Sequence, residues 1–270
     1  MSSSLPVALV TGVSSGIGHA TARALVERGY RVFGTVRSRE TPLPPEVQPV
    51  VLDVRDAESI EGGVRGVLNA TGRIDLLVNN AGASLIGALE ETSLAQAQAL
   101  FDVNFFGAVR VTQAVLPAMR ARKAGRIVFI SSVLGFLPAP FMAFYSASKH
   151  ALEGLAESLD HETRTFGVRA VLVEPGFTRT QIDSKGATAS ARIDEYSATR
   201  ARAVETVRSG VEHGDAPEIV AAAVLAAATA RRPKLRYPVG RKAGLLATLR
   251  SYMPASAFDG AFRKELRLDA

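Results

Sequence analysis

The chain has no cysteine among its 270 residues, and this absence removes two classes of structure at once. Without thiols it can form neither a disulfide framework nor a thiolate metal site, which fits a reducing compartment. The first residues, MSSSLPVALVTG, also lack the basic segment, long apolar run and cleavage site of a secretory signal. No stretch stays apolar for the roughly 18 residues that a membrane span requires. We therefore expect a soluble, cytoplasmic protein.

Acidic residues are scarce near the C-terminus, and the net charge of +6 comes from this part of the chain. From Arg231 onward, ten basic residues stand against three acidic ones, so the rest of the chain is close to neutral. The simplest interpretation is a solvated tail, because charge runs usually face water. Attraction to an acidic membrane surface or to an anionic substrate is the alternative. A basic tail on a neutral body does not predict nucleic-acid binding.

Short apolar runs alternate with longer stretches of helical period, and 47% hydrophobic residues supply ample material for a core. Runs that are apolar nearly throughout are typical of strands buried on both faces of a parallel sheet. We expect one α/β domain over residues 1–270, a doubly wound parallel sheet with helices on both faces. The expected strands are Pro6–Val10, Arg31–Val36, Val47–Leu52, Asp75–Val78, Gly125–Ile130, Val168–Val173 and Leu235–Val239, and the clearest helices are Gly18–Arg28, Ala95–Arg122 and Ser148–Phe166.

Two stretches interrupt this alternation. Residues 41–49 hold four prolines and predict an irregular surface loop. Residues 177–214 are polar, Ala-rich and weakly periodic, and a segment of this length inside a compact domain is usually a lid or binding segment. A basic amphipathic extension follows over about residues 231–270, and its spacing suits a cover over the substrate cleft, a subunit interface or a membrane contact.

The first strand leads directly into a glycine-rich turn, Thr11-Gly-Val-Ser-Ser-Gly-Ile-Gly18. Gly12 allows a tight bend, Gly16 lets the backbone approach a pyrophosphate, and Gly18 lets the following helix pack near the strand. Free N–H groups at the helix start would face the anion. A purely structural turn is the alternative, since a glycine pattern alone is a weak signal. We expect cofactor contacts from this turn, including those of Ser14, Ser15 and Ile17.

The spacing GxxxGxG after Thr11 resembles the short-chain dehydrogenase/reductase family, whose fold is of the Rossmann type. The family's acidic position at the end of the second strand is Val36 here, and Arg37 follows it. A carboxylate there would repel a 2′-phosphate, whereas a guanidinium can bind one, so the pattern favours NADP(H). The alternative is an exposed arginine at a strand end. The resemblance also implies that Asp53 and Val54 contact the adenine, although Asp53 could instead cap the next helix.

Tyr145-Ser-Ala-Ser-Lys149 places a phenol and an ammonium four residues apart, which brings them to one face of a helix. A free tyrosine has a pKa near 10, and a nearby cation favours the phenolate. Ser132 lies thirteen residues earlier at the end of an expected central strand, where its hydroxyl can hold a substrate oxygen. Ser131 is its rival, and the thirteen-residue offset of the family selects Ser132. An ordinary turn serine is the plain alternative.

Three further segments match the family in the expected order. Asn104 lies among apolar residues and needs a buried partner, which could simply be a broken helix turn. The resemblance implies instead that Asn104 holds a water that connects Lys149 to solvent. It also implies cofactor contacts from residues that follow the fourth and sixth expected strands, namely Asn80, Ala81, Gly82, Pro175, Gly176, Thr178 and Thr180.

The resemblance implies an oxidoreductase that moves a hydride between NADP(H) and a ketone or secondary alcohol, or an aldehyde and its alcohol. Tyr145 would donate or accept the proton, Lys149 would bind the nicotinamide ribose, Ser132 would orient the oxygen, and no metal is needed. The alternatives are a reductase of a small or polyketide-type carbonyl and a non-catalytic NADP(H) sensor.

The start and the tail of the chain resemble the 17β-hydroxysteroid and retinol dehydrogenase branch of the family, which implies a steroid, retinoid or other lipid-like substrate. An apolar pocket would suit it. The resemblance also implies a homodimer or homotetramer. The apolar residues expected near the site are Leu85, Leu134, Phe136, Leu137, Phe141, Met142, Phe144 and Phe177, several of which could be core.

Overall fold

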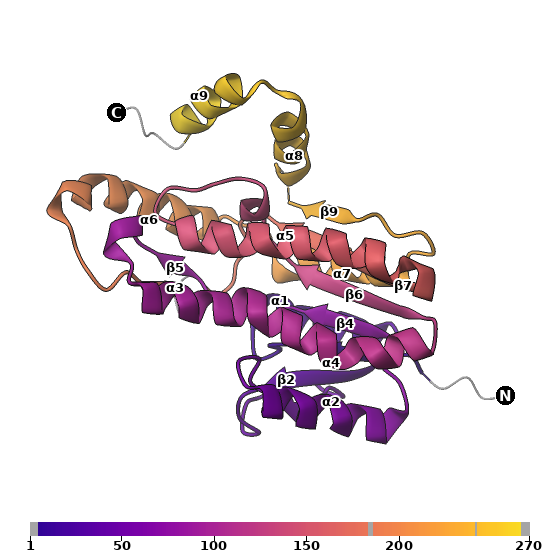
Figure 1. The fold of residues 1–270 in the computed structure, drawn as a ribbon. Coiled ribbons are helices and arrows are strands. Elements are labelled where there is room, and N and C mark those ends of the chain that lie inside the picture. Colours follow the sequence, from indigo (N-terminus) through magenta and orange to yellow (C-terminus); the bar gives the residue numbers. More distant parts are fainter. Residues whose placement is uncertain (1–4, 183–185, 241, 266–270) are drawn as a thin grey trace.

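A single parallel sheet of seven strands forms the centre of the protein (Figure 1). The computed structural model describes residues 5–182, 186–240 and 242–265. The strand order is β3-β2-β1-β4-β6-β7-β9, and every neighbouring pair is parallel. The strands are β1 (Val7–Val10), β2 (Arg31–Val36), β3 (Gln48–Val51), β4 (Leu76–Asn79), β6 (Gly125–Ile130), β7 (Val168–Pro175) and β9 (Arg236–Val239).

This sheet confirms the expected doubly wound α/β fold, and each expected strand is present to within two residues. The four central strands are fully buried along most of their length, as their continuous apolar sequences predicted. Pro49 lies inside β3, where a proline is tolerated because β3 is an edge strand. The irregular loop expected over residues 41–49 therefore ends two residues earlier, at Val47, before β3 begins at Gln48.

Helices cover both faces of the sheet. On one face, α2, α4 and α5 bury their apolar sides against β1, β4, β6 and β7 in one continuous core. On the other face, α1 and α7 pack against each other and against the same strands. The helices are α1 (Gly16–Glu27), α2 (Ala57–Thr71), α4 (Gly107–Ala121), α5 (Ala143–Thr163) and α7 (Pro217–Thr229), with the short turn η4 (Arg164–Phe166) after α5.

Helix α5 begins at Ala143, five residues before the start that the sequence pattern indicated at Ser148. The polar run Ser146-Ala-Ser148 hides its first turn from a periodicity search, yet both serines are buried. This earlier start matters because it includes Tyr145. Helix α2 follows Asp53, where the sequence allowed a helix but did not count it among the clearest ones, because its three interior glycines dilute its apolar stripe.

One long helical stretch runs from Leu94 to Ala121 and consists of α3 (Leu94–Phe101), the π-helical segment η2 (Asp102–Phe106) and α4. By length and composition this stretch is apolar enough to cross a membrane, which corrects the expectation that no such stretch exists. One such helix is weak support for a membrane span, because a core helix passes the same test. Here its buried side packs against α2, α5 and the sheet.

The expected lid region contains β8 (Ala187–Thr188), η5 (Asp194–Tyr196) and α6 (Ser197–Glu212). Strand β8 pairs with the short β5 (Leu85–Ile86) outside the main sheet. Glu91, in the turn η1 (Leu89–Glu91), is buried, forms an ion pair with Arg200 of α6 and accepts a hydrogen bond from the N–H of Ile193. These contacts join residues 193–200 firmly to the loop after β5.

The C-terminal extension forms two helices, α8 (Ala243–Tyr252) and α9 (Ala255–Glu265), which stand off from the body beyond β9 (Figure 1). Ala243 is buried at the start of α8, and Phe258 is buried between Arg250 and Phe262. In contrast, Leu245 and Tyr252 are exposed.

Candidate active site

The residues singled out from the sequence gather at the carboxyl ends of the central strands. The glycine-rich turn follows β1, Asn80 follows β4, Ser132 follows β6, and β7 ends at Pro175. Because all these strands are parallel and adjacent, their carboxyl ends meet at one edge of the sheet. In open α/β sheets this edge is where ligands bind, at the point where the strand order reverses.

The turn after β1 needs its three glycines for different reasons. Gly12 and Gly16 have φ values of 70° and 58°, in the left-handed region that glycine adopts most easily. Gly18 has no room for a side chain, since a Cβ would lie 2.2 Å from the carbonyl oxygen of Gly12. The helix therefore begins tightly against the strand, and Ile17 packs into the core on that side.

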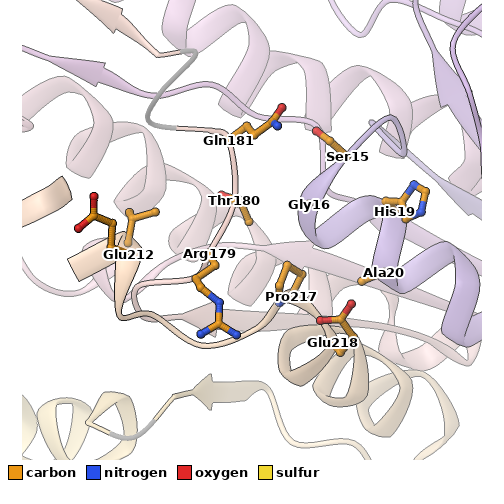
Figure 2. Close-up of a pocket in the computed structure, with 11 residues that line it drawn as sticks. Ser15, Gly16, His19, Ala20, Arg179, Thr180, Gln181, Glu212, Pro217 and Glu218 are labelled. Carbon is orange, nitrogen blue, oxygen red and sulfur yellow. The ribbon is translucent and has the colours of Figure 1, made fainter. Parts of the chain in front are cut away.

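A cavity of about 490 Å³ opens at the start of α1 (Figure 2). Ser15 is the N-cap of α1 but makes no side-chain capping bond, and both Ser15 and Gly16 line the cavity, so the first N–H groups of the helix lie beside it without that partner. Thr180 closes the opposite side, and a Cβ on Gly16 would lie 3.1 Å from its methyl group. Ser14 and Ser15 are exposed. An uncapped helix start, a bare glycine backbone and an open cavity together fit a pyrophosphate.

Thr11 and Asn80 fix the shape of this turn. The Thr11 hydroxyl accepts hydrogen bonds from the N–H groups of Asn80 and Ala81, both at 2.9 Å. The Asn80 amide donates to the carbonyl oxygens of Thr11 and Gly12 at 2.8 and 2.9 Å. The Asn80 side chain therefore holds the turn in place from within the protein, and its direct contact with a cofactor stays a prediction. Thr35 supports the turn too, because its hydroxyl accepts from the N–H of Gly12.

The end of β2 carries the residues expected to choose the cofactor. Val36 is buried, so that position offers no carboxylate, and Arg37 is exposed directly after it. Asp53 forms a bidentate ion pair with Arg55, whose Nη2 lies 2.6 Å from Oδ2. That hydrogen bond lowers the pKa of Asp53 to about 2, and Arg37 contributes in the same direction. Asp53 is therefore paired with the Arg55 guanidinium and is also influenced by the charge of Arg37.

The alternative role considered for Asp53, a helix cap, falls to another residue. Asp56 is the N-cap of α2, and its carboxylate accepts from the N–H groups of Glu58 and Ser59. Val54 is buried against Gly107, where a Cβ would lie 2.8 Å from its methyl group. Arg55 had no distinguishing signal in the sequence beyond its place two residues after Asp53.

Lys149 is buried in α5, and its Nζ donates a hydrogen bond of 2.9 Å to the carbonyl oxygen of Ile130. The same Nζ lies 5.7 Å from the centre of the Tyr145 ring. Burial lowers the pKa of Lys149 to about 8, against an opposing effect of the negative charge on Glu153. The structure therefore brings the phenol and the ammonium together on one helix face, as their four-residue spacing predicted.

Asn104 lies in the π-helical segment η2 and is buried. Its Oδ1 accepts from the N–H of Ala83 at 2.8 Å, and its Nδ2 donates to the Ala83 carbonyl at 3.0 Å. Nδ2 also lies 3.2 Å from the hydroxyl of Ser148, which in turn donates to the carbonyl oxygen of Tyr145. Asn104 thus connects the loop after β4, which includes the neighbouring Gly82, to helix α5. Ser148 is a link that the sequence did not single out.

Ser132 and Ser131 have different environments. Ser132 is half-buried, and its Oγ accepts a hydrogen bond from the N–H of Leu134 as the cap of the turn η3 (Val133–Gly135). Ser131 is buried beside Glu153 and Gly135. Because Ser132 is partly exposed at the carboxyl edge of the sheet and Ser131 is buried, Ser132 is the better candidate for holding a substrate oxygen, which agrees with the thirteen-residue offset.

The segment after β7 returns along the same edge. Gly176 donates from its N–H to the carbonyl of Val239, and Thr178 is buried with its hydroxyl bonded to the carbonyl of Gly176. Pro175 is fully buried at the strand end. These hydrogen bonds hold the segment between the end of β7 and Thr180, which lines the cavity. Across the described residues, no three histidine, aspartate or glutamate side chains are grouped to hold a metal.

The apolar residues expected around the substrate separate into distinct environments. Leu85, Leu137 and Met142 are buried in the protein. Phe141 stacks edge-on with Tyr196 of the lid region, and Phe177 packs on α6 at Gly210. Phe144 lines a different cavity, of about 580 Å³, over α3 and α4. Phe144 therefore does not belong with the expected substrate pocket.

The fold and this edge of the sheet are those of a Rossmann-type, dinucleotide-binding protein. Residues 6–191 match the family described as short chain dehydrogenase. The chain belongs to the short-chain dehydrogenase/reductase family and is an oxidoreductase that acts on the pair formed by an alcohol and its carbonyl.

Several relatives are similar over most of their length. A 3-ketodihydrosphingosine reductase of Bacteroides thetaiotaomicron is 34% identical over 95% of this chain and 96% of that protein. An NADPH-dependent 3-dehydrocapnine reductase of Ornithobacterium rhinotracheale is 31% identical, with coverage of 96% and 97%. Human retinol dehydrogenase 8 is 36% identical, with coverage of 90% and 84%, which confirms the resemblance to retinol dehydrogenase-like members.

Solved structures agree on the fold. A short-chain dehydrogenase from Streptomyces avermitilis has a TM-score of 0.82 at 37% identity, covering 97% of this chain and 99% of that one. A Burkholderia cenocepacia relative in complex with NADP has a TM-score of 0.76 at 27% identity, with coverage of 98% and 99%. A Burkholderia phymatum relative in complex with NAD has a TM-score of 0.77 at 28% identity, with coverage of 91% and 92%.

Proposed function

We propose that this oxidoreductase uses NADP(H) to reduce a hydrophobic ketone, or to oxidise the corresponding secondary alcohol, with Tyr145 as the proton donor or acceptor. The observation that carries the proposal is the buried Lys149 ammonium beside Tyr145, at the strand ends that also hold Ser132 and the phosphate turn. A bound nicotinamide would supply or accept the hydride at its C4 position.

Four side chains have separate roles in binding the substrate oxygen and transferring the proton. The Ser132 hydroxyl donates to the substrate oxygen and holds it near Tyr145. As the carbonyl carbon is reduced, its oxygen becomes negative and takes the phenolic proton of Tyr145. The Lys149 ammonium stabilises the phenolate that remains and binds the nicotinamide ribose. Asn104 keeps the first turns of α5 in register with the loop after β4, and it holds the water through which Lys149 exchanges protons with solvent.

The preference for NADP(H) follows from the end of β2. Arg37 is exposed directly after Val36, which occupies the position where NAD-binding proteins place an acidic residue, and the nearby Asp53 is already paired with Arg55. A 2′-phosphate would meet two guanidinium groups here, and a guanidinium binds phosphate bidentately. The 3-dehydrocapnine reductase is named as NADPH-dependent, which supports the proposal.

A hydrophobic substrate is supported by two observations. Phe136 and Leu134 are half-buried directly after Ser132, and Phe141 and Phe177 come from segments that meet the lid region. The relatives named above act on a 3-ketodihydrosphingosine, a 3-dehydrocapnine and a retinol, of which the first and last are long apolar molecules. We therefore propose a lipid-like ketone in preference to a small or polyketide-type carbonyl.

The test is a substrate screen that follows NADPH oxidation with long-chain β-keto amines, steroids, retinal and simple aromatic ketones. We expect turnover of an apolar carbonyl by the wild type and a loss of about 10²–10⁴-fold in kcat for Tyr145→Phe, because general acid catalysis contributes about that much. NADPH binding should persist in the variant. NADPH binding without turnover of any carbonyl by the wild type would instead indicate a cofactor sensor.

We also propose that the protein forms homodimers or homotetramers. The cavity over α3 and α4 is lined mostly by apolar side chains, and Leu94 and Phe106 at its rim are exposed. A large exposed apolar surface commonly marks an interface. Light scattering after size exclusion tests the proposal, and a monomer at micromolar concentration would contradict it.

A further inference from the structure

Two buried glutamates meet just behind the candidate catalytic lysine. Glu153 lies one turn after Lys149 on α5, and Glu174 lies at the end of β7. Their exposed fractions are 6% and 0%. One cation, Arg236 of β9, faces both: its Nε lies 3.1 Å from Glu153 and 3.3 Å from Glu174. The same arginine also contacts Glu157 at the surface.

Three of the four carboxyl oxygen atoms of this pair lack a hydrogen-bond donor, whereas Oε2 of Glu153 accepts from Nε of Arg236. Oε1 of Glu153 and both oxygens of Glu174 are buried and accept no hydrogen bond. Buried polar atoms are nearly always paired, and two adjacent carboxylates cannot both carry charge beside a single cation. One proton bound between them would supply the missing donor, as it does in other buried carboxyl pairs.

The surroundings decide which carboxyl group holds that proton. Burial and the negative charge of Glu153 raise the pKa of Glu174 to about 8. Burial also raises the pKa of Glu153, but the Ser131 hydroxyl and Arg236 act in the opposite direction. These effects favour the proton on Glu174 and the negative charge on Glu153.

The sheet places this pair in the same corner as the reaction. Lys149 donates to the carbonyl of Ile130, and the next residue, Ser131, donates from its N–H to the carbonyl of Val173, directly before Glu174. The charge of Glu153 acts on Lys149 across one helical turn through protein interior, where screening by water is weak. It raises the pKa of Lys149 and opposes the effect of burial.

We propose that Glu153 is a positioning residue for proton transfer: Glu153 and Glu174 share one proton, and the remaining charge on Glu153 keeps the Lys149 ammonium charged. The pair is enclosed by few other charges. Helix α5 contributes Lys149 and Glu157, β9 contributes Arg236, and the turn after β6 contributes only the Ser131 hydroxyl.

The first experiment measures the pH profile of kcat/KM for ketone reduction, and it rests on the proposed function. Reduction needs a protonated Tyr145 and a charged Lys149, so the rate falls at alkaline pH. Losing the negative charge of Glu153 makes either group give up its proton at lower pH. Glu153→Gln alone would let Glu174 lose its proton and take over the negative charge, so both carboxyl groups are replaced. We expect Glu153→Gln combined with Glu174→Gln to move the alkaline limb down by about one pH unit, given one charge a helical turn away.

Matched variants separate this effect from a structural one. Glu157→Gln removes a second partner of Arg236, but it is half-exposed and should move the limb much less. Glu153→Asp keeps the charge and should restore the wild-type limb even if it lowers stability. A limb in the double variant, Glu153→Gln with Glu174→Gln, that lies no lower than in Glu157→Gln would overturn the proposal.

A second experiment does not depend on activity or on the stability of Glu153→Gln. Infrared difference spectra at pH 7 between wild type and Glu174→Gln should contain the carbonyl band of a protonated carboxyl group, present only in the wild type. Absence of that band would overturn the shared proton, whatever the substrate screen finds. If the band is present and no carbonyl is reduced, the proposed function fails while the carboxyl pair stands.

Discussion

Lys149 reaches from α5 to the main chain of β6, where its Nζ donates a hydrogen bond to the carbonyl oxygen of Ile130. Ile130 lies two residues before Ser132, so one bond relates the cation of the candidate active site to the strand that carries the proposed oxygen-binding hydroxyl. The geometry of the two is therefore set by the sheet and the helix together, before any ligand is present.

The affinity for NADPH should depend on pH through Lys149. The lysine is charged below a pKa of about 8 and neutral above it, so its attraction for the cofactor is present at lower pH and is lost as the pH rises through 8. We expect Kd for NADPH to increase between pH 7 and pH 9 in fluorescence titrations. Lys149→Met should bind more weakly at pH 7 and show no such rise; an equal rise in both proteins would contradict this role.

Cofactor preference should depend on Arg37. Arg37→Ala removes a guanidinium from the expected position of the 2′-phosphate, so Kd for NADPH should rise about tenfold or more while Kd for NADH changes little. Arg23→Ala is a suitable control, because Arg23 is an exposed arginine of α1 whose ion pair is with Glu27. The proposal fails if both cofactors lose affinity equally on replacement of Arg37.

Gly18→Ala should damage the phosphate turn. The added Cβ would lie 2.2 Å from the carbonyl oxygen of Gly12 and 2.4 Å from the Asn80 amide nitrogen, both of which shape the turn. We expect a loss of about 1–3 kcal/mol in the free energy of unfolding, typical of overpacking, together with weaker NADPH binding. Gly62→Ala in α2 meets nothing within 4 Å and should stabilise by about 0.4–1 kcal/mol. Urea unfolding of both variants measures the contrast.

Stability should fall with rising pH because of Glu174. In the folded protein Glu174 keeps its proton up to a pKa of about 8, whereas in the unfolded chain it loses that proton near its ordinary value of 4.5. Between these values the folded state binds the extra proton, so its contribution to stability is complete at low pH and is lost as the pH approaches 8. Glu174→Gln should flatten the free energy of unfolding from pH 5 to pH 8, while Glu157→Gln should retain the wild-type slope.

Much of the fold could be predicted because the central strands are buried on both faces and therefore read as unbroken apolar runs. The early turn of α5 could not, since its buried serines look polar in the sequence although they bond within the protein. Helix α2 was less clear because of its glycines, and α6 was hidden by a polar surface with no buried residue among its positions. In these cases the tertiary contacts outweigh the local pattern.

The candidate site divides in the same way. The phosphate turn and the Tyr145–Lys149 pair follow from short spacings along one element, and such spacings are visible in the sequence. The partners of Asp53 and the meeting of Glu153 with Glu174 depend on the register between elements. Arg236 reaches Glu153 across 83 residues of sequence, and no local pattern reports such a contact.

The π-helical turn at Asn104 makes the position of that side chain depend on the number of residues in the chain. A π segment takes more residues per turn than an α-helix. The side chains that follow it therefore point in different directions around the helix axis than they would in an uninterrupted α-helix. Deleting one residue between Asp102 and Phe106 would restore regular winding and rotate everything that follows by about 100° relative to what precedes it. The amide of Asn104 and the whole of α4 could not then both keep their neighbours. Such a deletion would therefore cost either the buried hydrogen bonds of Asn104 or the packing of α4, although it hardly changes the composition of the helix.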